Sequence, residues 1–266
     1  MTTTARHPSG YLLDNAARQV PDRFAALAEL YDEPSFRRLR EVGVGPGWRC
    51  LEVGAGGGSV ARWLAESVGP RGVVTATDLD IRCIEHLEVP NLDVIRHDIV
   101  RDRLPVLAYD LIHCRLVLTH LPDPMTAIDK LIRSLRPGGW LVLEEFDTSL
   151  LDFACPAPRT KAEHRANRIR EAFIRLLELR GVDLQLAPRL PSVLGDRGFE
   201  QVSLRGSYES GPAVNALERA NLEQVRVELL GQGITADELD AHLEALPQLR
   251  LLMPVMISTV ARKWPS

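Results

Sequence analysis

The stretch LEVGAGGGSV (residues 51–60) decides the fold of this chain. A short apolar run that begins at Trp48 leads into it, and the segment that follows, 59–69, has apolar residues at helical spacing. Glycine loses more backbone entropy on folding than other residues, so a cluster of glycines indicates a turn with special backbone angles or a closely approaching ligand. The sequence therefore predicts a strand, a glycine-rich turn and a helix in succession, with a ligand at the turn.

Strand-like and helix-like segments continue to alternate beyond this helix. The predicted strands cover 73–79, 92–98, 109–118 and 140–146, and the predicted helices between them cover 81–89 and 127–136. Strands that alternate with helices build crossover units, in which the strands run parallel and helices cover both faces of the sheet. We therefore expect an α/β fold.

Helical segments flank this core on both sides. We divide the chain into a helical N-terminal lid (1–47), the core (48–147), a helical cap insertion (148–190) and a last part (191–266) that completes the core and adds a helical substrate cap. In the lid, we expect Pro34 in the first turn of a second helix. The insertion is too long for a simple connection, which favours a cap over the sheet edge. The last part is predicted to contain a long helix over 216–231, a helix opened by a capping box at 235–238 and a final strand over 254–264.

Composition narrows the function classes. The chain has 266 residues, of which 45% are hydrophobic, and its net charge of −4 argues against a nucleic-acid binder held by phosphate contacts. No apolar run has the length of a membrane span, and residues 1–10 lack the apolar part of a signal peptide, so we expect a cytoplasmic protein without a membrane partner. The four cysteines lie far apart and show no zinc-type spacing, so no metal is predicted.

The order of the glycines separates two kinds of cofactor. A dinucleotide site has the pattern GxGxxG, whereas here Gly54, Gly56 and Gly58 are followed by serine in the sixth place and preceded by Glu52. The pattern ExGxGxG resembles motif I of the class I S-adenosylmethionine-dependent methyltransferases, and the resemblance extends over about residues 48–146. It implies a Rossmann-like, seven-stranded, mostly parallel sheet with an antiparallel last strand. It also implies S-adenosylmethionine as cofactor and S-adenosylhomocysteine as product.

The resemblance assigns cofactor contacts at the ends of the first two strands. The backbone of the turn, Ala55 included, would lie against the methionine part, and the Glu52 carboxylate would orient the amides of the turn or meet the ammonium group. Asp78 would accept the ribose hydroxyls, with Leu79 beside the adenine. The alternative for this acidic stretch is a helix N-cap at Asp78 or Asp80.

The next two strand ends complete the expected cofactor site. Asp98 would accept the adenine amino group and Ile99 would offer its backbone amide; the alternative is that Asp98 caps the following turn. Cys114 and Arg115 would lie where the fourth strand passes the methionine end of the cofactor. An acid at Asp78 alone also suits NAD, so the pair of acids is the sharper signal.

Five residues are candidates for catalysis, substrate binding or closure of the site. His120 is a possible catalytic base, or else packs against a helix. Glu145 and Asp147 share one side of a strand, as a catalytic acid or base and a substrate anchor, or else as caps or solvated charges. Tyr11 would cover the cofactor, or else staple the first helix. Arg189 would lie in the substrate pocket, or else is a surface charge.

The expected reaction is methyl transfer to an oxygen, nitrogen or carbon atom of a small molecule, in the style of actinobacterial secondary metabolism. Such a transfer depends mainly on alignment of the nucleophile, and a base is needed only if the nucleophile must lose a proton. Two alternatives stay open: an S-adenosylmethionine-binding cyclase or regulator that does not methylate, and an NAD-dependent oxidoreductase, which the glycine pattern disfavours. A homodimer would follow if the N-terminal helices crossed to a second copy.

Overall fold

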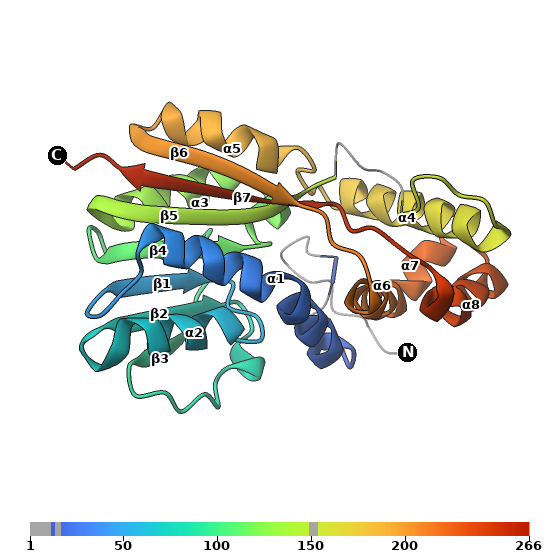
Figure 1. Ribbon diagram of the computed structural model, residues 1–266, viewed down its shortest axis with the longest axis horizontal. Helices are drawn as coiled ribbons and strands as arrows, with labels where there is room; N and C mark the ends of the chain where they lie inside the picture. Colours follow the sequence, from blue (N-terminus) through green and yellow to red (C-terminus); the bar gives the residue numbers. More distant parts are fainter. Residues whose placement is uncertain (1–11, 14–16, 149–153, 266) are drawn as a thin grey trace.

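Seven strands form one sheet within the residues that the computed structural model describes, 12–13, 17–148 and 154–265. Their order is β3-β2-β1-β4-β5-β7-β6 (Figure 1). Neighbours from β3 to β5 are parallel, and β7 is antiparallel to both β5 and β6, which confirms the predicted sheet. The strands are β1 Arg49–Val53, β2 Val73–Asp78, β3 Leu92–Arg96, β4 Tyr109–Arg115, β5 Leu135–Asp147, β6 Phe199–Ser207 and β7 Val255–Lys263.

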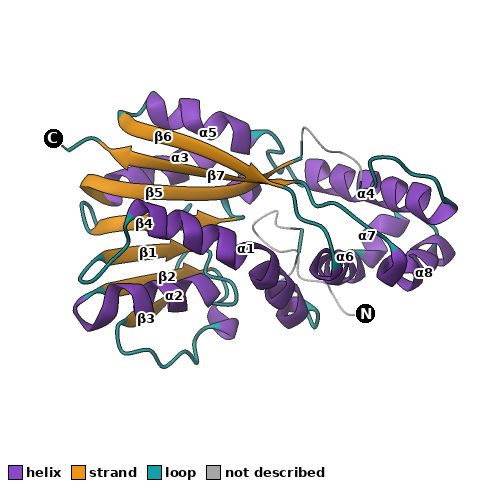
Figure 2. Ribbon diagram, in the orientation of Figure 1, coloured by secondary structure: helices purple, strands orange, loops and turns teal. Residues whose placement is uncertain are grey.

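Helices cover both faces of the sheet and one of its ends (Figure 2). Helices α1 and α2 pack on one face, and α3 and α5 pack on the other. The α-helices are α1 Val20–Val42, α2 Ser59–Val68, α3 Pro124–Ser134, α4 Lys161–Leu179, α5 Leu186–Gly195, α6 Pro212–Gln224, α7 Arg226–Leu230 and α8 Ala236–Ala245. The short 3₁₀ helices are η1 Gly69–Arg71, η2 Ile81–Cys83, η3 Leu118–His120 and η4 Leu246–Gln248.

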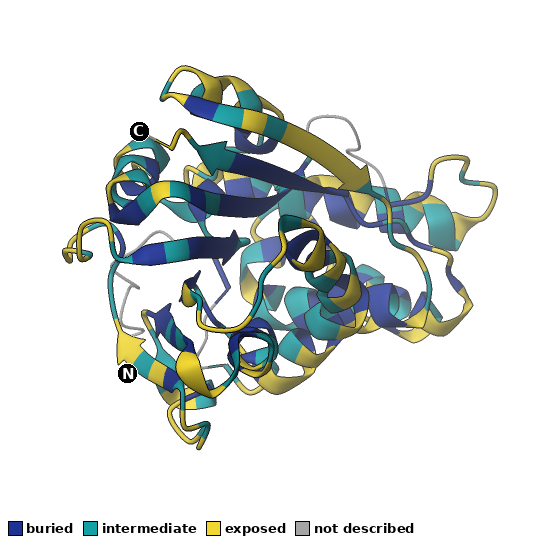
Figure 3. Ribbon diagram, turned by 60° about the vertical axis from the view of Figure 1, so that its left-hand side comes forward, coloured by how far each residue is buried: buried dark blue, intermediate teal, exposed yellow. Residues whose placement is uncertain are grey.

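The period of two along each strand explains why both faces are buried. Successive side chains of a strand point to opposite faces, so β1 places Cys50 in the cluster with α2 and Leu51 in the cluster with α3 and α5. Helix α3 contributes Ile128 and Leu131, which lie one turn apart on its apolar face. Figure 3 shows the central strands as buried, with exposed residues on the outer helix faces and on the edge strand β6.

Helices α4, α6, α7 and α8 form a cap beyond the carboxyl ends of the parallel strands (Figure 1). Ile169, Val214 and Leu239 are fully buried in the core of this cap. Helix α1 belongs to both parts, because Leu30 packs in the cap core whereas Leu39 packs in the cluster with α2. The carboxyl ends of the strands, where ligands bind in open α/β sheets, therefore face the cap.

The cap draws on two separate parts of the chain. Helix α4 precedes β6, and α6 to α8 lie between β6 and β7. The expected domain boundary at residue 190 falls inside α5, whose Leu190 and Leu194 pack on the sheet. Helix α5 therefore packs with the core.

The segment 81–89 does not form the predicted helix. Only Ile81–Cys83 makes a short 3₁₀ turn. A helix there would be short, and the proline that follows disfavours helical backbone in the residue before it. The apolar side chains of Ile84 and Leu87 pack instead against Gly58 of the glycine turn.

Two other helices differ from expectation at one residue each. Pro34 lies inside one continuous helix, α1, because both halves of that helix are held by tertiary packing. The predicted helix over 216–231 is interrupted at Val225, which is fully buried in the cap core and separates α6 from α7.

Candidate active site

The glycine turn follows β1 at the point where the strand order reverses, between β1 and β4. Gly54, Gly56 and Gly58 have φ angles of 70°, 52° and 79°, in the region that favours glycine. A Cβ atom on Gly54 would lie 2.2 Å from Val117 Cγ2, and one on Gly58 would lie 2.7 Å from Leu87. Backbone angles and close packing therefore both require these glycines.

Asp78 fastens this turn to the end of β2. Its Oδ2 atom accepts a hydrogen bond from the Gly56 amide (2.9 Å) and its Oδ1 atom accepts one from the Asp80 amide (3.0 Å). Burial raises the pKa of Asp78, although the amide donors oppose this shift. Each carboxylate oxygen can accept a further hydrogen bond, so Asp78 fits a ligand with two neighbouring hydroxyl groups.

The end of β3 lies beside Asp78, because the His97 amide donates to the Asp78 carbonyl (2.9 Å). Asp98 caps the turn that follows, where its Oδ1 atom accepts hydrogen bonds from two amides (2.9 and 3.3 Å). Leu79 is 46% exposed next to these acids, whereas the side chain of Ile99 is buried. The arrangement places two acids and an exposed apolar side chain at neighbouring strand ends.

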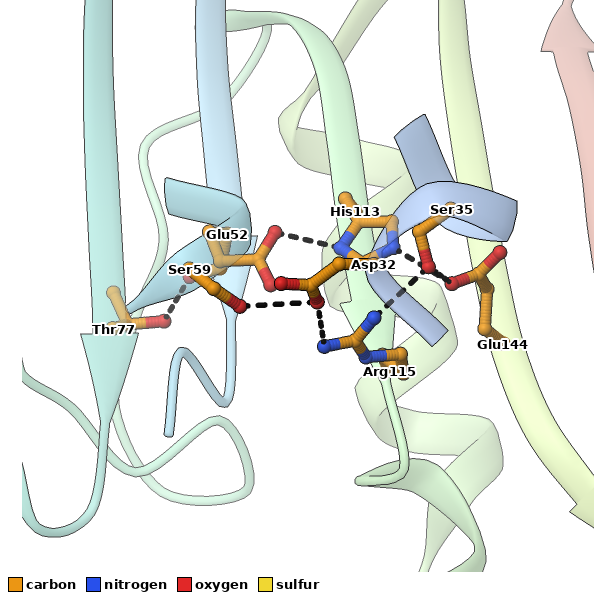
Figure 4. A network of polar contacts seen from close by, with 8 residues as sticks. All are labelled: Asp32, Ser35, Glu52, Ser59, Thr77, His113, Arg115 and Glu144. Carbon is orange, nitrogen blue, oxygen red and sulfur yellow. Dashed lines mark hydrogen bonds and ion pairs between the residues drawn. The ribbon is translucent and has the colours of Figure 1, made fainter. Parts of the chain in front are cut away.

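Glu52 makes its side-chain contact away from the glycine turn, with His113, the residue opposite it on β4. Its Oε2 atom lies 2.7 Å from His113 Nδ1, and His113 Nε2 lies 3.2 Å from Glu144 Oε2 (Figure 4). Burial alone would lower the pKa of His113, but the two carboxylates raise it to about 9. Burial would likewise raise the pKa of Glu144, but His113 and Arg115 bring it to about 2. Burial raises the pKa of Glu52, although His113 opposes this shift. A buried imidazolium therefore lies between two acidic side chains.

Arg115 continues these contacts to helix α1 (Figure 4). Its guanidinium donates to Asp32 Oδ1 (2.8 Å) and to Ser35 Oγ (3.0 Å), and Ser35 Oγ donates to Glu144. The Ser59 hydroxyl, at the start of α2, also donates to Asp32 (3.1 Å). We call these residues the sheet–helix network: Asp32, Ser35, Glu52, Ser59, His113, Arg115 and Glu144. It fastens α1 to three strands and to the helix that follows the glycine turn.

The turn after β4 connects the glycine turn to the cap. Val117 packs against Gly54, and the preceding residue, Leu116, has a φ of 58°, which is unusual for a residue with a side chain. Such backbone strain persists only where the surrounding structure enforces it, and it is frequent at functional sites.

Glu145 helps to hold the strained turn after β4 in place. Its carboxylate accepts hydrogen bonds from the amides of Val117 (3.0 Å) and Leu118 (2.6 Å) and from the Thr119 hydroxyl (2.9 Å). Burial raises the pKa of Glu145 to about 7, against the effect of these donors. The contacts of Glu145 are thus those of a residue that positions the turn.

A cavity of about 90 Å³ lies between this turn and the cap. Leu116 and His120 form its wall on the sheet side. Apolar side chains of α1, α4 and α6 line much of the rest, among them Leu27, Phe173 and Leu217. The polar residues of its lining are Arg23, His120, Thr148, Arg170, Glu218 and Asn221. The cavity is small, largely apolar and provided with a few polar groups, as expected of a ligand site.

Comparison with known sequences matches this architecture to one family. The sequence model of the family described as methyltransferase domain matches residues 12–204, most of the chain. The chain belongs to the methyltransferase-domain family. The sequence-based assignment to the class I S-adenosylmethionine-dependent methyltransferases is thereby confirmed, and with it the predicted cofactor.

Individual relatives of this methyltransferase are distant. "Methyltransferase str2" of Strobilurus tenacellus is 33% identical over 110 residues, which are 41% of this chain and 39% of the fungal protein. A ubiquinone biosynthesis O-methyltransferase of Paracidovorax citrulli is 25% identical over 225 residues, covering 68% of this chain and 93% of the relative. The solved structure of phosphoethanolamine N-methyltransferase 2 from Haemonchus contortus shares the fold, with a TM-score of 0.57 and 16% identity over 88% of this chain and 53% of that one.

The residues present fit the cofactor of the family. The glycine turn lies at the carboxyl end of β1, where the strand order reverses, and Asp78 offers two buried carboxylate oxygens beside it. In the described part of the chain, no helix is both long and apolar enough to cross a membrane. Among the same residues, no three His, Cys, Asp or Glu side chains gather as a metal site requires.

The structure brings the predicted catalytic and substrate residues together only in part. His120 lines the cavity, and burial, followed by the charge of Arg23, lowers its pKa to about 4, so the imidazole is neutral near pH 7. Asp147 is buried at the end of β5. Arg189 is exposed on α5, pairs with Asp183 and borders a separate surface hollow, because α5 packs on the sheet and not in the cap. Tyr11 lies outside the described residues.

Sequence reasoning missed the residues that α1 and the cap contribute. Phe24 of α1 packs against Gly56 of the glycine turn, and Arg170 and Glu218 of the cap line the cavity. A signal for the last two exists in the sequence. Arg170 lies one turn before Phe173, and Glu218 lies one turn after Val214, so each charge falls on an apolar helix face.

Proposed function

We propose that this methyltransferase transfers the methyl group of S-adenosylmethionine to a small-molecule acceptor in the cavity between the sheet and the cap. The observation that carries the proposal is the shared wall formed by the turn after β4. On one side of this turn Val117 packs against Gly54, and on the other Leu116 and His120 line the cavity. A nucleophile in the cavity is thus only one chain segment away from the turn that holds the methyl donor.

The residues that line the cavity support two functions, alignment of the acceptor and exclusion of water. The cofactor supplies a methyl group on a positively charged sulfur, which is already activated for displacement. Leu27, Phe173 and Leu217 surround the acceptor with apolar groups, which strengthens every polar contact inside. His120 is neutral near pH 7 and has a pKa of about 4, so its role toward a hydroxyl or amine nucleophile is to orient it by accepting a hydrogen bond.

The small cavity and the activities for which relatives are named support a small acceptor. One relative is a ubiquinone biosynthesis O-methyltransferase, and one structural neighbour is a phosphoethanolamine N-methyltransferase. We place the acceptor among secondary metabolites, with oxygen, nitrogen or carbon as the methylated atom. No part of this assignment requires a metal.

Calorimetry with S-adenosylhomocysteine tests the donor half of the proposal. We expect S-adenosylhomocysteine to bind in the micromolar range. The affinity should fall at least about tenfold in Asp78→Asn, because an NH2 group then replaces one of the two oxygens that accept hydrogen bonds from the ribose hydroxyls. Asp80→Asn is the matched control, since its carboxylate binds Arg82 at the surface and should leave the affinity unchanged.

A methyl-transfer assay tests the acceptor half of the proposal. The protein is incubated with S-adenosylmethionine that carries an isotope-labelled methyl group and with a panel of phenols, amines and activated carbon acids. We expect a methylated product from at least one class. Absence of S-adenosylhomocysteine binding at high micromolar concentration, or tight binding of NAD in its place, would refute the proposal. Cofactor binding without any methylated product would favour a non-methylating role.

A further inference from the structure

Side chains of helix α1 hold the glycine turn from one side. Phe24 packs against the middle of the turn, where a Cβ atom added to Gly56 or to Gly57 would lie 3.0 Å from it. About two helical turns further along α1, Asp32 accepts a hydrogen bond (3.1 Å) from the hydroxyl of Ser59, with which α2 begins directly after the glycine turn. A single helix therefore contacts both the middle and the end of the turn.

The start of the glycine turn is held through strand β4. Glu52, near the end of β1, contacts His113 of β4 (2.7 Å), and two residues further along β4 Arg115 donates to Asp32 (2.8 Å). Asp32 is thus a branch point, because its Oδ1 atom accepts hydrogen bonds both from Arg115 and from Ser59 (Figure 4). The two ends of the turn are therefore connected to each other through one strand and one helix.

Attachment of α1 to the sheet does not by itself require this branch. The side chains of Arg115 and Asp32 are 12% and 15% exposed, so both charges lie largely out of water. Apolar side chains of similar volume often hold two elements together as well as such a pair does. A hydrogen bond depends on direction as well as on distance, so the contact to Ser59 fixes the end of the turn relative to β4.

We propose that Asp32 is a positioning residue for the methyl donor. Acting through Ser59, it fixes the end of the glycine turn in the shape that receives the amino-acid part of S-adenosylmethionine. Preorganisation of this kind depends on side chains that support the binding groups from behind. The inference rests on the proposed function, because it takes Asp78 as the site of the ribose.

Two points define the path of the donor. Asp78, at the end of β2, fits the neighbouring hydroxyl groups of the ribose and accepts from the Gly56 amide (2.9 Å). The methyl group has to reach the cavity, whose wall on the sheet side includes Leu116, beyond the end of β4. Since β1 lies between β2 and β4, the turn after β1 lies between these two points. The part of the donor beyond the ribose therefore passes the turn whose end Asp32 fixes.

The test compares S-adenosylhomocysteine with methylthioadenosine, which keeps the ribose and the sulfur but lacks the amino-acid part. Binding of each compound to the full chain is measured by calorimetry. In Asp32→Ala, the affinity for S-adenosylhomocysteine should fall at least about fivefold, because the turn loses a hydrogen bond to a charged group. The affinity for methylthioadenosine should change less than about twofold, since its ribose is bound at a separate strand end. A role in stability alone would weaken both compounds alike.

Glu33→Ala is the matched control. Its carboxylate is exposed on the same helix and pairs with Arg40, so both affinities should stay within about twofold of those of the wild-type protein. Ser59→Ala removes the other partner of the hydrogen bond to Asp32 and carries the test if Asp32→Ala does not fold. It should show the same selective loss, whereas Ser67→Ala on the same helix, α2, should not.

The double variant Asp32→Ala/Ser59→Ala completes the test. It should bind S-adenosylhomocysteine no more than about twofold more weakly than the weaker single variant, because both substitutions remove the same contact. An unchanged affinity in Asp32→Ala, an equal loss for both compounds, or additive losses in the double variant would overturn the positioning role. Failure of the wild-type protein to bind S-adenosylhomocysteine would overturn the proposed function itself.

Discussion

The sheet–helix network and the Arg170–Glu218 pair are both buried groups of charges, but they differ in what they leave unused. In the network, both nitrogens of His113 contact carboxylates, and Arg115 donates to two partners on α1. In the cap, Arg170 Nη2 lies 3.1 Å from Glu218 Oε2, whereas His242 Nε2 lies 3.8 Å from Glu218 Oε1. Short hydrogen bonds therefore connect the charges of the network, whereas one oxygen of the cap carboxylate has only a longer ion-pair contact.

The largest expected effect comes from removing the centre of the network. In His113→Leu, Glu52 and Glu144 remain buried without their common partner, so the free energy of unfolding should fall by about 3–5 kcal/mol. Urea denaturation measures this change. Arg40→Leu, which breaks an exposed pair with Glu33 and a contact of the guanidinium with the Trp63 ring, should lower the stability by about 1 kcal/mol or less. A His113→Leu protein as stable as wild type would show that the network does not hold the fold.

The cap pair should behave differently when both charges are removed. Arg170→Met alone leaves the buried Glu218 carboxylate with only its longer contact to His242, which should cost about 3 kcal/mol of unfolding free energy. The double variant Arg170→Met/Glu218→Leu should recover to within about 1 kcal/mol of wild type. Urea denaturation of the two single variants and the double variant forms a complete cycle. A double variant less stable than both single variants would mean that the cap depends on these charges.

Above pH 6.5, the pH dependence of stability should follow the network and not the cap. The folded-state pKa of His113, about 9, exceeds its ordinary value of 6.5, so its contribution is complete below pH 6.5 and is lost as the pH rises toward 9. The loss should be on the order of 3 kcal/mol. Glu145, with its pKa raised to about 7 by burial, adds a decline of the same sign between pH 4.5 and 7.

Urea denaturation across this range measures the slope. In His113→Leu the decline between pH 6.5 and 9 should disappear, because the group that loses its proton there is gone. At the acid end, Glu144 of the network and Glu218 of the cap both contribute fully above pH 4.5 and progressively less as the pH falls toward 2. An unchanged slope in His113→Leu would contradict the charge assigned to the imidazole.

The smallest expected difference in stability is that between removing the Ser35 hydroxyl, which bridges two residues, and removing the Asn221 amide, whose oxygen has no hydrogen bond. Ser35 joins Arg115 to Glu144, so Ser35→Ala should cost about 1–2 kcal/mol of unfolding free energy. Asn221→Leu should change stability by less than about 0.5 kcal/mol, since the amide oxygen that it removes has no partner. Thermal or urea denaturation resolves this difference, and equal costs would remove the distinction between the two regions.

The parts of the molecule that depend on local pattern could be predicted from the sequence. The glycine turn, the strand ends that carry Asp78 and Asp98, and the capping box at Thr235 are each set by residues within a few positions of one another. The sequence also predicts, as an alternative, the observed role of Asp98 as a cap of the following turn. The failures in secondary structure, at 81–89 and at Val225, are places where packing against distant residues outweighs local propensity.

The cavity could not be predicted in the same way. Arg170 and Glu218 lie on helices separated by two elements of the core, and only the packing of the cap brings them together. The contacts of Glu145 could not be predicted from the sequence for the same reason. Alternation along β5 predicts its face of the sheet, but the amides of Val117 and Leu118 that occupy its carboxylate belong to another strand end.

Pro34 gives helix α1 a mechanical weak point between two bodies. A proline inside a helix removes one backbone hydrogen bond and crowds the carbonyl four residues earlier, here that of Leu30. The part of α1 before Pro34 contacts both bodies, because Leu30 packs with the cap whereas Asp32 binds Arg115 of β4. In the same part of the helix, Phe24 packs against the glycine turn, so a shift of the cap that bent α1 would reach the turn through this side chain.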